Sequence, residues 1–142
     1  MSSYLIDTNV VSELRKGSRA DARVIAWLQR RDRRELFLSA ITLAELRRGI
    51  ALIARRDSAQ GDNLRVWCDR LQHDFGRTGR LLPIRAAEAS AWGELMALRP
   101  LPVLDGFLAA TAQVHSLILA TRNEADFAGL SVQIENPFAA SS

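Results

Sequence analysis

The sequence has a single cysteine among its 142 residues, which narrows the range of possible architectures. One cysteine cannot form a disulfide within the chain or supply a zinc site built on several thiolates. Cys68 falls in a helical pattern with Leu64, Trp67, Leu71 and Phe75. This pattern predicts that Cys68 is a small core residue.

Long apolar runs are also lacking. No run reaches the roughly 18 residues that a membrane span needs, and the N-terminus lacks the basic start and long apolar stretch of a signal peptide. The hydrophobic fraction of 48% and the charged fraction of 25% are ordinary for a globular protein. We therefore expect a cytoplasmic protein with no membrane partner, built as one domain over residues 1–138 with a disordered tail at 139–142.

Several catalytic motifs are missing. The chain has no GxxxxGK[ST] phosphate loop, no GxGxxG after a strand and no GxSxG elbow. His73 and His115 lie 42 residues apart on separate predicted helices, outside any HExxH motif, and we expect them to be structural or exposed. An aspartyl-phosphate phosphatase would have a second aspartate two positions after Asp7, where this chain has Asn9.

Lysine is nearly absent, because Lys16 is the only one, and arginine supplies almost all of the positive charge. Residues 1–60 carry 12 basic and 7 acidic side chains, whereas residues 61–142 carry 7 and 9. The arginines cluster as Arg30-Arg31, Arg33-Arg34, Arg47-Arg48 and Arg55-Arg56. Three interpretations stay open: a solvated helix face, a surface for a polyanion such as RNA, or a surface for an acidic partner segment.

Short apolar runs alternate with helical patterns along the chain. The predicted strands are 3–7, 35–39, 80–84, 117–121 and 132–135, and the predicted helices are 8–15, 20–31, 42–56, 60–77, 85–98, 104–116 and 124–128. This alternation predicts an α/β fold, a three-layer α/β/α sandwich with a mainly parallel central sheet of about five strands. Trp27 and Trp67 lie on two of these helices and fit either core packing or a partner surface.

Four carboxylates are predicted to lie at one edge of this sheet. Asp7 follows the first strand, Glu45 lies one turn into the helix after the second, and Asp126 follows strand 117–121. Asp105 opens the helix that leads into that strand. Because open parallel sheets bind ligands beyond the carboxyl ends of their strands, this edge is the expected site.

Each carboxylate also has a structural interpretation. Thr42 and Glu45 fit a capping box, and Asn123 and Asp126 fit a similar cap. Asp105 fits an N-cap, and the carboxylate of Asp7 fits the exposed amides of the following helix.

If the four carboxylates meet, they cannot all stay ionised without a cation. Hard oxygen ligands without histidine or thiolate select Mg²⁺, or Mn²⁺, over zinc. A bound ion beside a basic surface suits phosphodiester hydrolysis, because the metal activates a water and stabilises charge on phosphorus.

Three segments of the chain combine these acidic and small polar positions: "LIDTNVVSEL" at 5–14, "ITLAELRRGI" at 41–50 and "LDGFLAATAQVHSLILATRNEADF" at 104–127. Together they resemble the PIN-domain family, most closely its VapC/FitB-type toxins of bacterial toxin–antitoxin pairs. The segments match in order and spacing over essentially the whole chain. The resemblance implies an α/β/α sandwich, Mg²⁺-dependent ribonuclease activity on RNA, a cognate antitoxin, operator DNA bound only through that antitoxin, and a homodimer.

The resemblance also implies roles for individual residues. The expected metal ligands are Asp7 and Asp105, and the acidic site is completed by Glu45 and Asp126, directly or through water. The small polar positions expected to orient carboxylates or waters are Thr8, Asn9, Thr121 and Asn123. Gly106 stands where we expect alanine or another small residue.

The resulting hypothesis is a toxin that hydrolyses RNA with a metal-activated water at a four-carboxylate site. Two alternatives remain. One is a non-catalytic module that acts in an antitoxin complex on operator DNA, and the other is a housekeeping RNA-processing nuclease.

Overall fold

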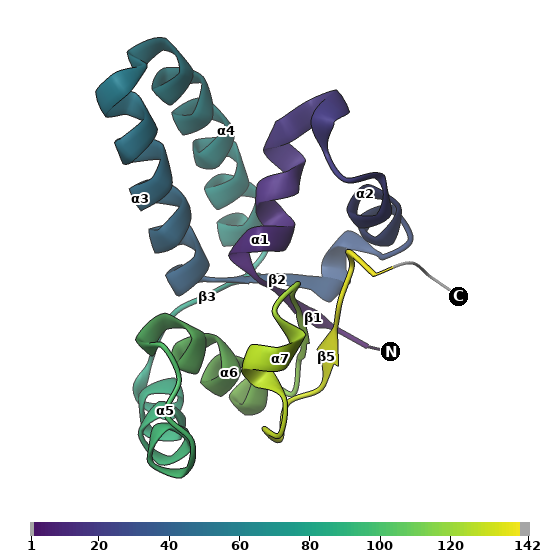
Figure 1. The fold of residues 1–142 in the computed structure, drawn as a ribbon, viewed down its shortest axis with the longest axis vertical. Coiled ribbons are helices and arrows are strands. Elements are labelled where there is room, and N and C mark those ends of the chain that lie inside the picture. The colour runs from purple at the N-terminus through teal and green to yellow at the C-terminus, as the bar shows by residue number, and fades with distance from the viewer. Residues whose placement is uncertain (1, 140–142) are drawn as a thin grey trace.

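A parallel five-stranded sheet lies between two layers of helices in the computed structural model, which describes residues 2–139 (Figure 1). The strands are β1 (Tyr4–Ile6), β2 (Leu36–Ser39), β3 (Leu81–Leu82), β4 (Ile118–Ala120) and β5 (Ile134–Glu135). Their order is β3-β2-β1-β4-β5, and all neighbouring pairs are parallel. The predicted fold class is therefore confirmed.

The helices follow the predicted pattern closely. They are α1 (Thr8–Val11), α2 (Ala22–Gln29), α3 (Ala40–Arg56), α4 (Ser58–Arg77), α5 (Ala86–Leu98), α6 (Val103–His115) and α7 (Glu124–Phe127), with 3₁₀ helices η1 (Ser12–Arg19) and η2 (Arg33–Glu35). The helix predicted at 8–15 differs, since its α-helical part ends at Val11 and η1 continues the chain.

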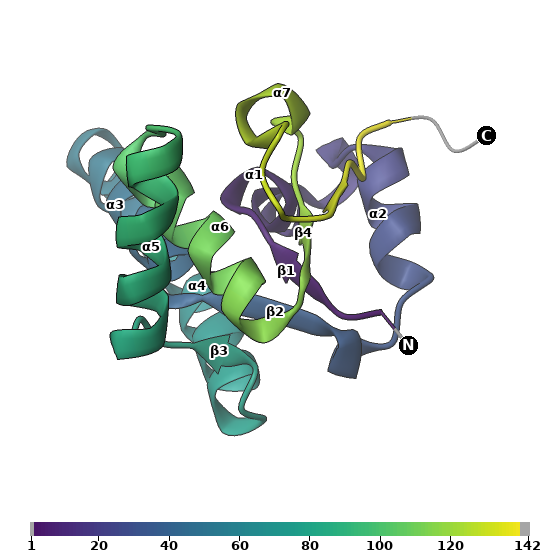
Figure 2. The same cartoon turned by 90° about the horizontal axis from the view of Figure 1, so that it is seen from below.

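The strands separate two hydrophobic cores. Along β1, Tyr4 and Ile6 belong to the core under α1–α4, whereas Leu5 belongs to the core under α5 and α6. Figure 2 shows these two helical layers from below, with α7 at the far end from β3. Because each side chain of β1 is buried in a particular core, the register of the strand is set. The set register determines that Asp7 is the residue at its carboxyl end.

Several smaller expectations can be compared with the structure. Cys68 is buried, as predicted, and so is Trp27, while Trp67 packs partly buried against the same core. From residue 140 onward, the predicted tail lies outside the described residues. Within residues 2–139, no single helix is long and apolar enough to cross a membrane, although α5 and α6 would pass together as a pair bent by 118°.

Helices α3 and α4 form a hairpin whose closest approach depends on a glycine. A methyl group added at Gly61 would lie 2.4 Å from the Cβ atom of Ala54 and 2.7 Å from its Cα atom. Since one of these atoms is backbone, the two helices would have to separate. Glu45 lies on α3, so the packing of α3 against α4 also helps to position its carboxylate.

We predict that Gly61→Ala lowers the free energy of unfolding by about 1–3 kcal/mol, because overpacking forces the helices apart. Gly93→Ala is the matched control, since Gly93 is helical and exposed with nothing within 4 Å. It should raise stability by about 0.4–1 kcal/mol. Urea denaturation measures both, and similar changes for the two variants would contradict the close approach.

Candidate active site

Asp7 occupies the carboxyl end of β1 and is the most buried of the four carboxylates. Its backbone N–H donates to the carbonyl of Ala120 at 2.9 Å, so the main chain is still held by the sheet here. The residue is only 4% exposed. Its Oδ1 accepts from the Thr8 N–H at 2.6 Å, and its Oδ2 accepts from the Thr121 hydroxyl at 2.7 Å. The first of these bonds caps α1, as the structural interpretation of Asp7 predicted.

Burial raises the pKa of Asp7 above its usual value, and this effect outweighs the hydrogen bonds from Thr121, Thr8 and Asn9, which lower it. Within residues 2–139, none of these contacts comes from a cationic side chain. A carboxyl group held in this way has fixed oxygens. A cation bound beside it would favour its ionised form.

Asn9 and Thr121 connect the loop after β1 to the loop after β4. The Asn9 amide nitrogen donates to Asp7 Oδ2 at 3.3 Å, and the Asn9 amide oxygen accepts from the Arg122 N–H at 3.2 Å. The Thr121 hydroxyl oxygen accepts from the backbone N–H of Asn123 at 3.0 Å. Asn123 therefore takes part through its backbone, and its side chain makes no capping hydrogen bond.

Glu45 reaches the same place from α3. Its Oε1 accepts from the Thr8 hydroxyl at 2.8 Å, so Thr8 contacts both Asp7 and Glu45. The predicted capping box of Thr42 and Glu45 is wrong, because α3 begins at Ala40 and Ser39 caps it. Glu45 lies too far into the helix to reach its first amides, which leaves its carboxylate for the site.

Asp105 lies in the first turn of α6, where Pro102 is the N-cap, so the predicted N-cap role of Asp105 is wrong. Burial raises its pKa to about 6, with further contributions from the charges of Asp7, Glu45 and Asp126 in that order. Asp105 therefore lies near enough to the other three carboxylates for their charges to oppose its ionisation.

The start of α6 is held by aromatic packing. The Trp92 ring stacks on Phe107 at 5.0 Å, and its Nε1–H donates to the carbonyl of Val103 at 3.2 Å. A Cβ atom at Gly106 would lie 2.8 Å from Trp92 Nε1. More depends on this glycine than the sequence indicated, because it lets Trp92 lie against the helix turn that carries Asp105.

Asp126 is the most loosely held of the four, since it is exposed on the short helix α7. Its backbone carbonyl accepts from Arg99 Nη2 at 2.9 Å, and Arg99 Nη1 donates to the carbonyl of Ala128. Arg99 comes just after α5, so it ties the segment before Asp105 to the segment that carries Asp126. No sequence motif marked this arginine, because its role depends only on the tertiary contact.

The donor set fits Mg²⁺ better than zinc, as it consists of carboxylates, a threonine hydroxyl and an asparagine amide. Among residues 2–139, no group of three or more carboxylate, histidine or cysteine side chains is arranged to hold an ion directly. Magnesium keeps several of its waters and is commonly bound through one or two carboxylates. Two carboxylates in direct contact with the ion, with the others acting through water, are therefore compatible with this geometry.

The surroundings of Glu45 combine polar and apolar groups. A cavity of about 170 Å³ opens beside Thr8, Arg15 and Glu45 and continues to apolar side chains of α3 and α4. Arg47 is not free to meet a ligand, because its guanidinium is paired with Asp69 at 2.7 Å. Arg48, by contrast, is exposed.

Comparison with known proteins shows which family the whole chain resembles. A family model described as "PIN domain" matches residues 4–131. The chain is 35% identical to Toxin FitB of Neisseria gonorrhoeae, covering 94% of this chain and 97% of FitB. It is 34% identical to VapC ribonuclease Y4jK of Sinorhizobium fredii, covering 94% and 96% of the two chains.

A solved structure agrees with these sequence matches. A chain in the structure of FitAB bound to an IR36 DNA fragment superposes with a TM-score of 0.79 at 32% identity, covering 98% of both chains. The likeness therefore extends over the sheet and both helical layers.

We predict that Asp105→Asn stabilises the metal-free protein in a pH-dependent manner. In the wild type the pKa of Asp105 rises on folding from 3.8 to about 6. The folded protein then binds more protons in this window, so wild-type stability is lost as pH rises through it. Above pH 6 the variant should be more stable by about 1–2 kcal/mol, a value discounted for partial exposure.

Urea denaturation in EDTA at several pH values checks this prediction. Asp62→Asn is the control, because Asp62 is an exposed acid on α4. If the stability difference between Asp105→Asn and the wild type did not change with pH, the raised pKa would be contradicted.

Proposed function

This chain belongs to the PIN-domain family, and from that premise we propose that it is a Mg²⁺-dependent endoribonuclease that acts as the toxin of a toxin–antitoxin pair. The observation that carries the proposal is that Thr8 contacts both Asp7 and Glu45, while the charges of Asp7, Glu45 and Asp126 all act on Asp105. Within residues 2–139, the groups that hydrogen-bond to Asp7 are neutral. The names of the relatives, a toxin and a VapC ribonuclease, support the same activity.

In this proposal Asp7 and Asp105 hold the metal, and Glu45 and Asp126 act at the same ion, directly or through water. A bound magnesium ion supplies an activated water and stabilises the charge that develops on the phosphate during hydrolysis. Manganese would serve as a substitute, since it accepts the same oxygen ligands.

The polar residues around Asp7 keep this arrangement in a fixed orientation. The two oxygens of Asp7 are held by different donors, Thr8 on one and Thr121 on the other, so its carboxylate plane cannot rotate freely. Thr8 also holds Glu45 through its hydroxyl. Outer-shell contacts of this kind commonly change metal affinity or activity 10- to 100-fold when they are removed.

We further propose a cognate antitoxin as protein partner, with operator DNA bound only through it. The structure of FitAB bound to an IR36 DNA fragment supports a DNA-bound complex for a similar protein. A homodimer is supported by apolar side chains exposed around the α5–α6 connection. Leu98 is 89% exposed and Val103 is 56% exposed. Burying such side chains against a second copy would remove them from water.

The central prediction is that RNA cleavage requires Mg²⁺ and Asp7. Purified protein should cleave RNA with Mg²⁺ and not with EDTA, and Asp7→Asn should lower the rate at least about a hundredfold because an ion ligand is lost. The control Asp62→Asn should cleave normally, and added antitoxin should stop cleavage. Cleavage that persists in EDTA would refute the metal mechanism. An antitoxin complex without any turnover would favour the non-catalytic alternative.

A second prediction concerns Arg99 as a positioning residue. Arg99→Ala should lower cleavage about tenfold and raise the Mg²⁺ concentration needed for half-maximal rate, because the segment carrying Asp126 loses its anchor. Arg99→Lys should recover part of the cleavage rate and part of the Mg²⁺ affinity, since lysine keeps one hydrogen-bond donor group. Arg70→Ala, at an exposed arginine of α4, is the control. A loss of thermal stability without any change in the Mg²⁺ requirement would show that Arg99 is only structural.

A further inference from the structure

A basic pocket lies at the end of the sheet opposite the carboxylates. It has a volume of about 460 Å³ and is lined by Arg33, Arg34, Phe37, Asp74, Arg77, Thr78, Gly79 and Arg80. Arg80 directly precedes β3, and η2 with Arg33 and Arg34 directly precedes β2. Because the strands are parallel, the pocket is separated from the carboxylate edge by the length of β2, roughly 10 Å. We call it the amino-end pocket.

The end of α4 builds one wall of this pocket. Gly79 adopts a left-handed conformation with φ of 71°, which favours glycine. The Arg80 N–H donates to the carbonyl of Phe75, and the Gly79 N–H donates to that of Gly76, which together form a Schellman motif. The turn places the Arg80 guanidinium over the Phe75 ring, 4.3 Å from its centre.

Arg80 is a fixed and almost fully buried cation at 8% exposure. Its Nε donates to the Thr78 hydroxyl at 2.9 Å, and its Nη1 donates to the carbonyls of Arg33 and Leu36 at 2.9 and 2.8 Å. All these acceptors are neutral oxygens. Among the hydrogen bonds of residues 2–139, none joins Arg80 to a carboxylate or uses its Nη2 group.

The positive charge of Arg80 is not neutralised by the acidic side chains around it. Burial lowers its pKa, and the nearby charges of Arg33 and Arg77 lower it further, while Asp74 raises it. Among residues 2–139, Asp74 is the only acid lining the pocket, and its contact with Arg33 is long, at 3.8 Å. Arg34 is paired with Asp32 at 2.8 Å, so its charge is matched from outside the pocket lining. The C-terminus of α4 adds about half a negative charge, which offsets only part of the three remaining guanidinium groups.

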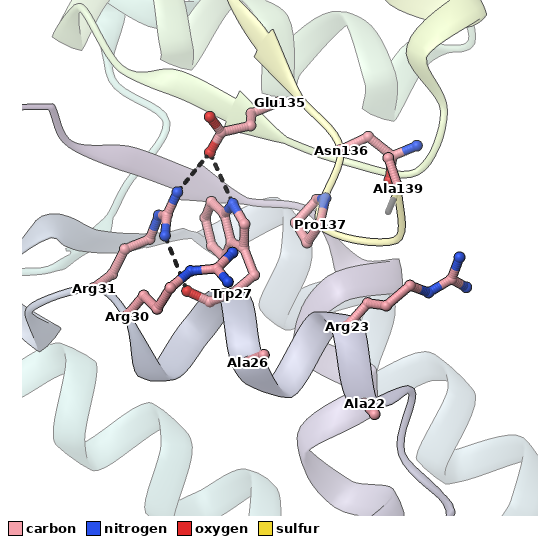
Figure 3. A pocket seen from close by; sticks show the side chains of 10 residues that line it. All are labelled: Ala22, Arg23, Ala26, Trp27, Arg30, Arg31, Glu135, Asn136, Pro137 and Ala139. Carbon is pink, nitrogen blue, oxygen red and sulfur yellow. Dashed lines mark hydrogen bonds and ion pairs between the residues drawn. The ribbon is translucent and has the colours of Figure 1, made fainter. Parts of the chain in front are cut away.

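A second arginine-lined pocket provides an internal comparison. It lies along α2 and the C-terminal segment and is shown in Figure 3. There, Arg31 is paired with Glu135 at 3.0 Å, and Trp27 Nε1 donates to the same carboxylate. Arg23 is paired with Asp21 at 2.7 Å. Some charges are matched in both pockets, since Arg34 of the amino-end pocket is paired with Asp32 at 2.8 Å. The pockets differ in their most buried arginine: Arg31 is paired with a carboxylate, whereas among residues 2–139 the hydrogen bonds of Arg80 go only to neutral oxygens.

We propose that the amino-end pocket binds a phosphate group. Arg80 supplies a preorganised guanidinium, and the exposed side chains of Arg33 and Arg77 contact the anion from the rim. Arginine suits this ligand, because its fork of donors matches phosphate oxygens and its hydrogen bonds to an anion are strong. The neutral bonds that Arg80 makes to Arg33 and Leu36 explain how it is held, but they do not explain why two further arginines gather around it.

Both an RNA backbone and a free phosphate ion could supply this group, and one experiment separates them. The wild type and the double variant Arg33→Ala/Arg77→Ala are titrated with inorganic phosphate and, separately, with a short RNA in EDTA, where cleavage is suppressed. The double variant leaves the buried Arg80 in place, so folding is preserved. The control is Arg55→Ala/Arg56→Ala, which removes the same charge from exposed positions outside the pocket.

The double variant should bind its phosphate ligand about tenfold more weakly than the control. Weaker binding of RNA, with a smaller dependence of affinity on salt, identifies the polynucleotide backbone as the source. Weaker binding of inorganic phosphate alone identifies a free phosphate ion. Equal affinities of the double variant and the control for both probes would overturn the proposal. Binding is measured without Mg²⁺, so the result does not depend on the proposed nuclease activity.

Discussion

The structure depends on a buried carboxyl group that the fold holds in place at the end of the central strand. Asp7 is nearly inaccessible to water, and within residues 2–139 the groups that contact it are neutral donors. This arrangement disfavours the charged form of Asp7, because burial outweighs those hydrogen bonds. It persists because the sheet and three hydrogen bonds hold the carboxylate in place, independently of any ligand. The position of Asp7 is therefore set by the fold itself, before any ion is bound.

The four acids reach this edge by different structural means, and their positions are not equally rigid. Asp7 is attached to the sheet itself, while Glu45 and Asp105 lie near the beginnings of two long helices that pack on opposite faces. Asp126 depends on a four-residue helix and on Arg99. This gradation places the most strongly held acid, Asp7, at the central strand and leaves Asp126 as the most exposed.

Much of this organisation was predictable from the sequence, because it follows from periodicity and topology. The apolar runs indicated all five strands, and the rule for parallel sheets indicated which residues share an edge. The capping interpretations of Glu45 and Asp105 failed because helix ends are uncertain by a few residues, and a cap depends on the exact position. Arg99 and Arg80 could not be identified, since their partners are backbone carbonyls of segments distant in sequence. The sequence also predicted that the four acids converge. It could not establish how many of them lie close enough together to contact a single ion directly.

The shortness of β1 determines which sequence changes it can tolerate. Its three residues alternate between two cores, so each has a required face, and the next residue leaves the sheet as Asp7. Substitutions among apolar residues of similar size would preserve this arrangement. The loss or gain of one residue would not, because a shift by one position exchanges the two faces of a strand. In this segment, the fold therefore depends more strictly on length than on the identity of the apolar side chains.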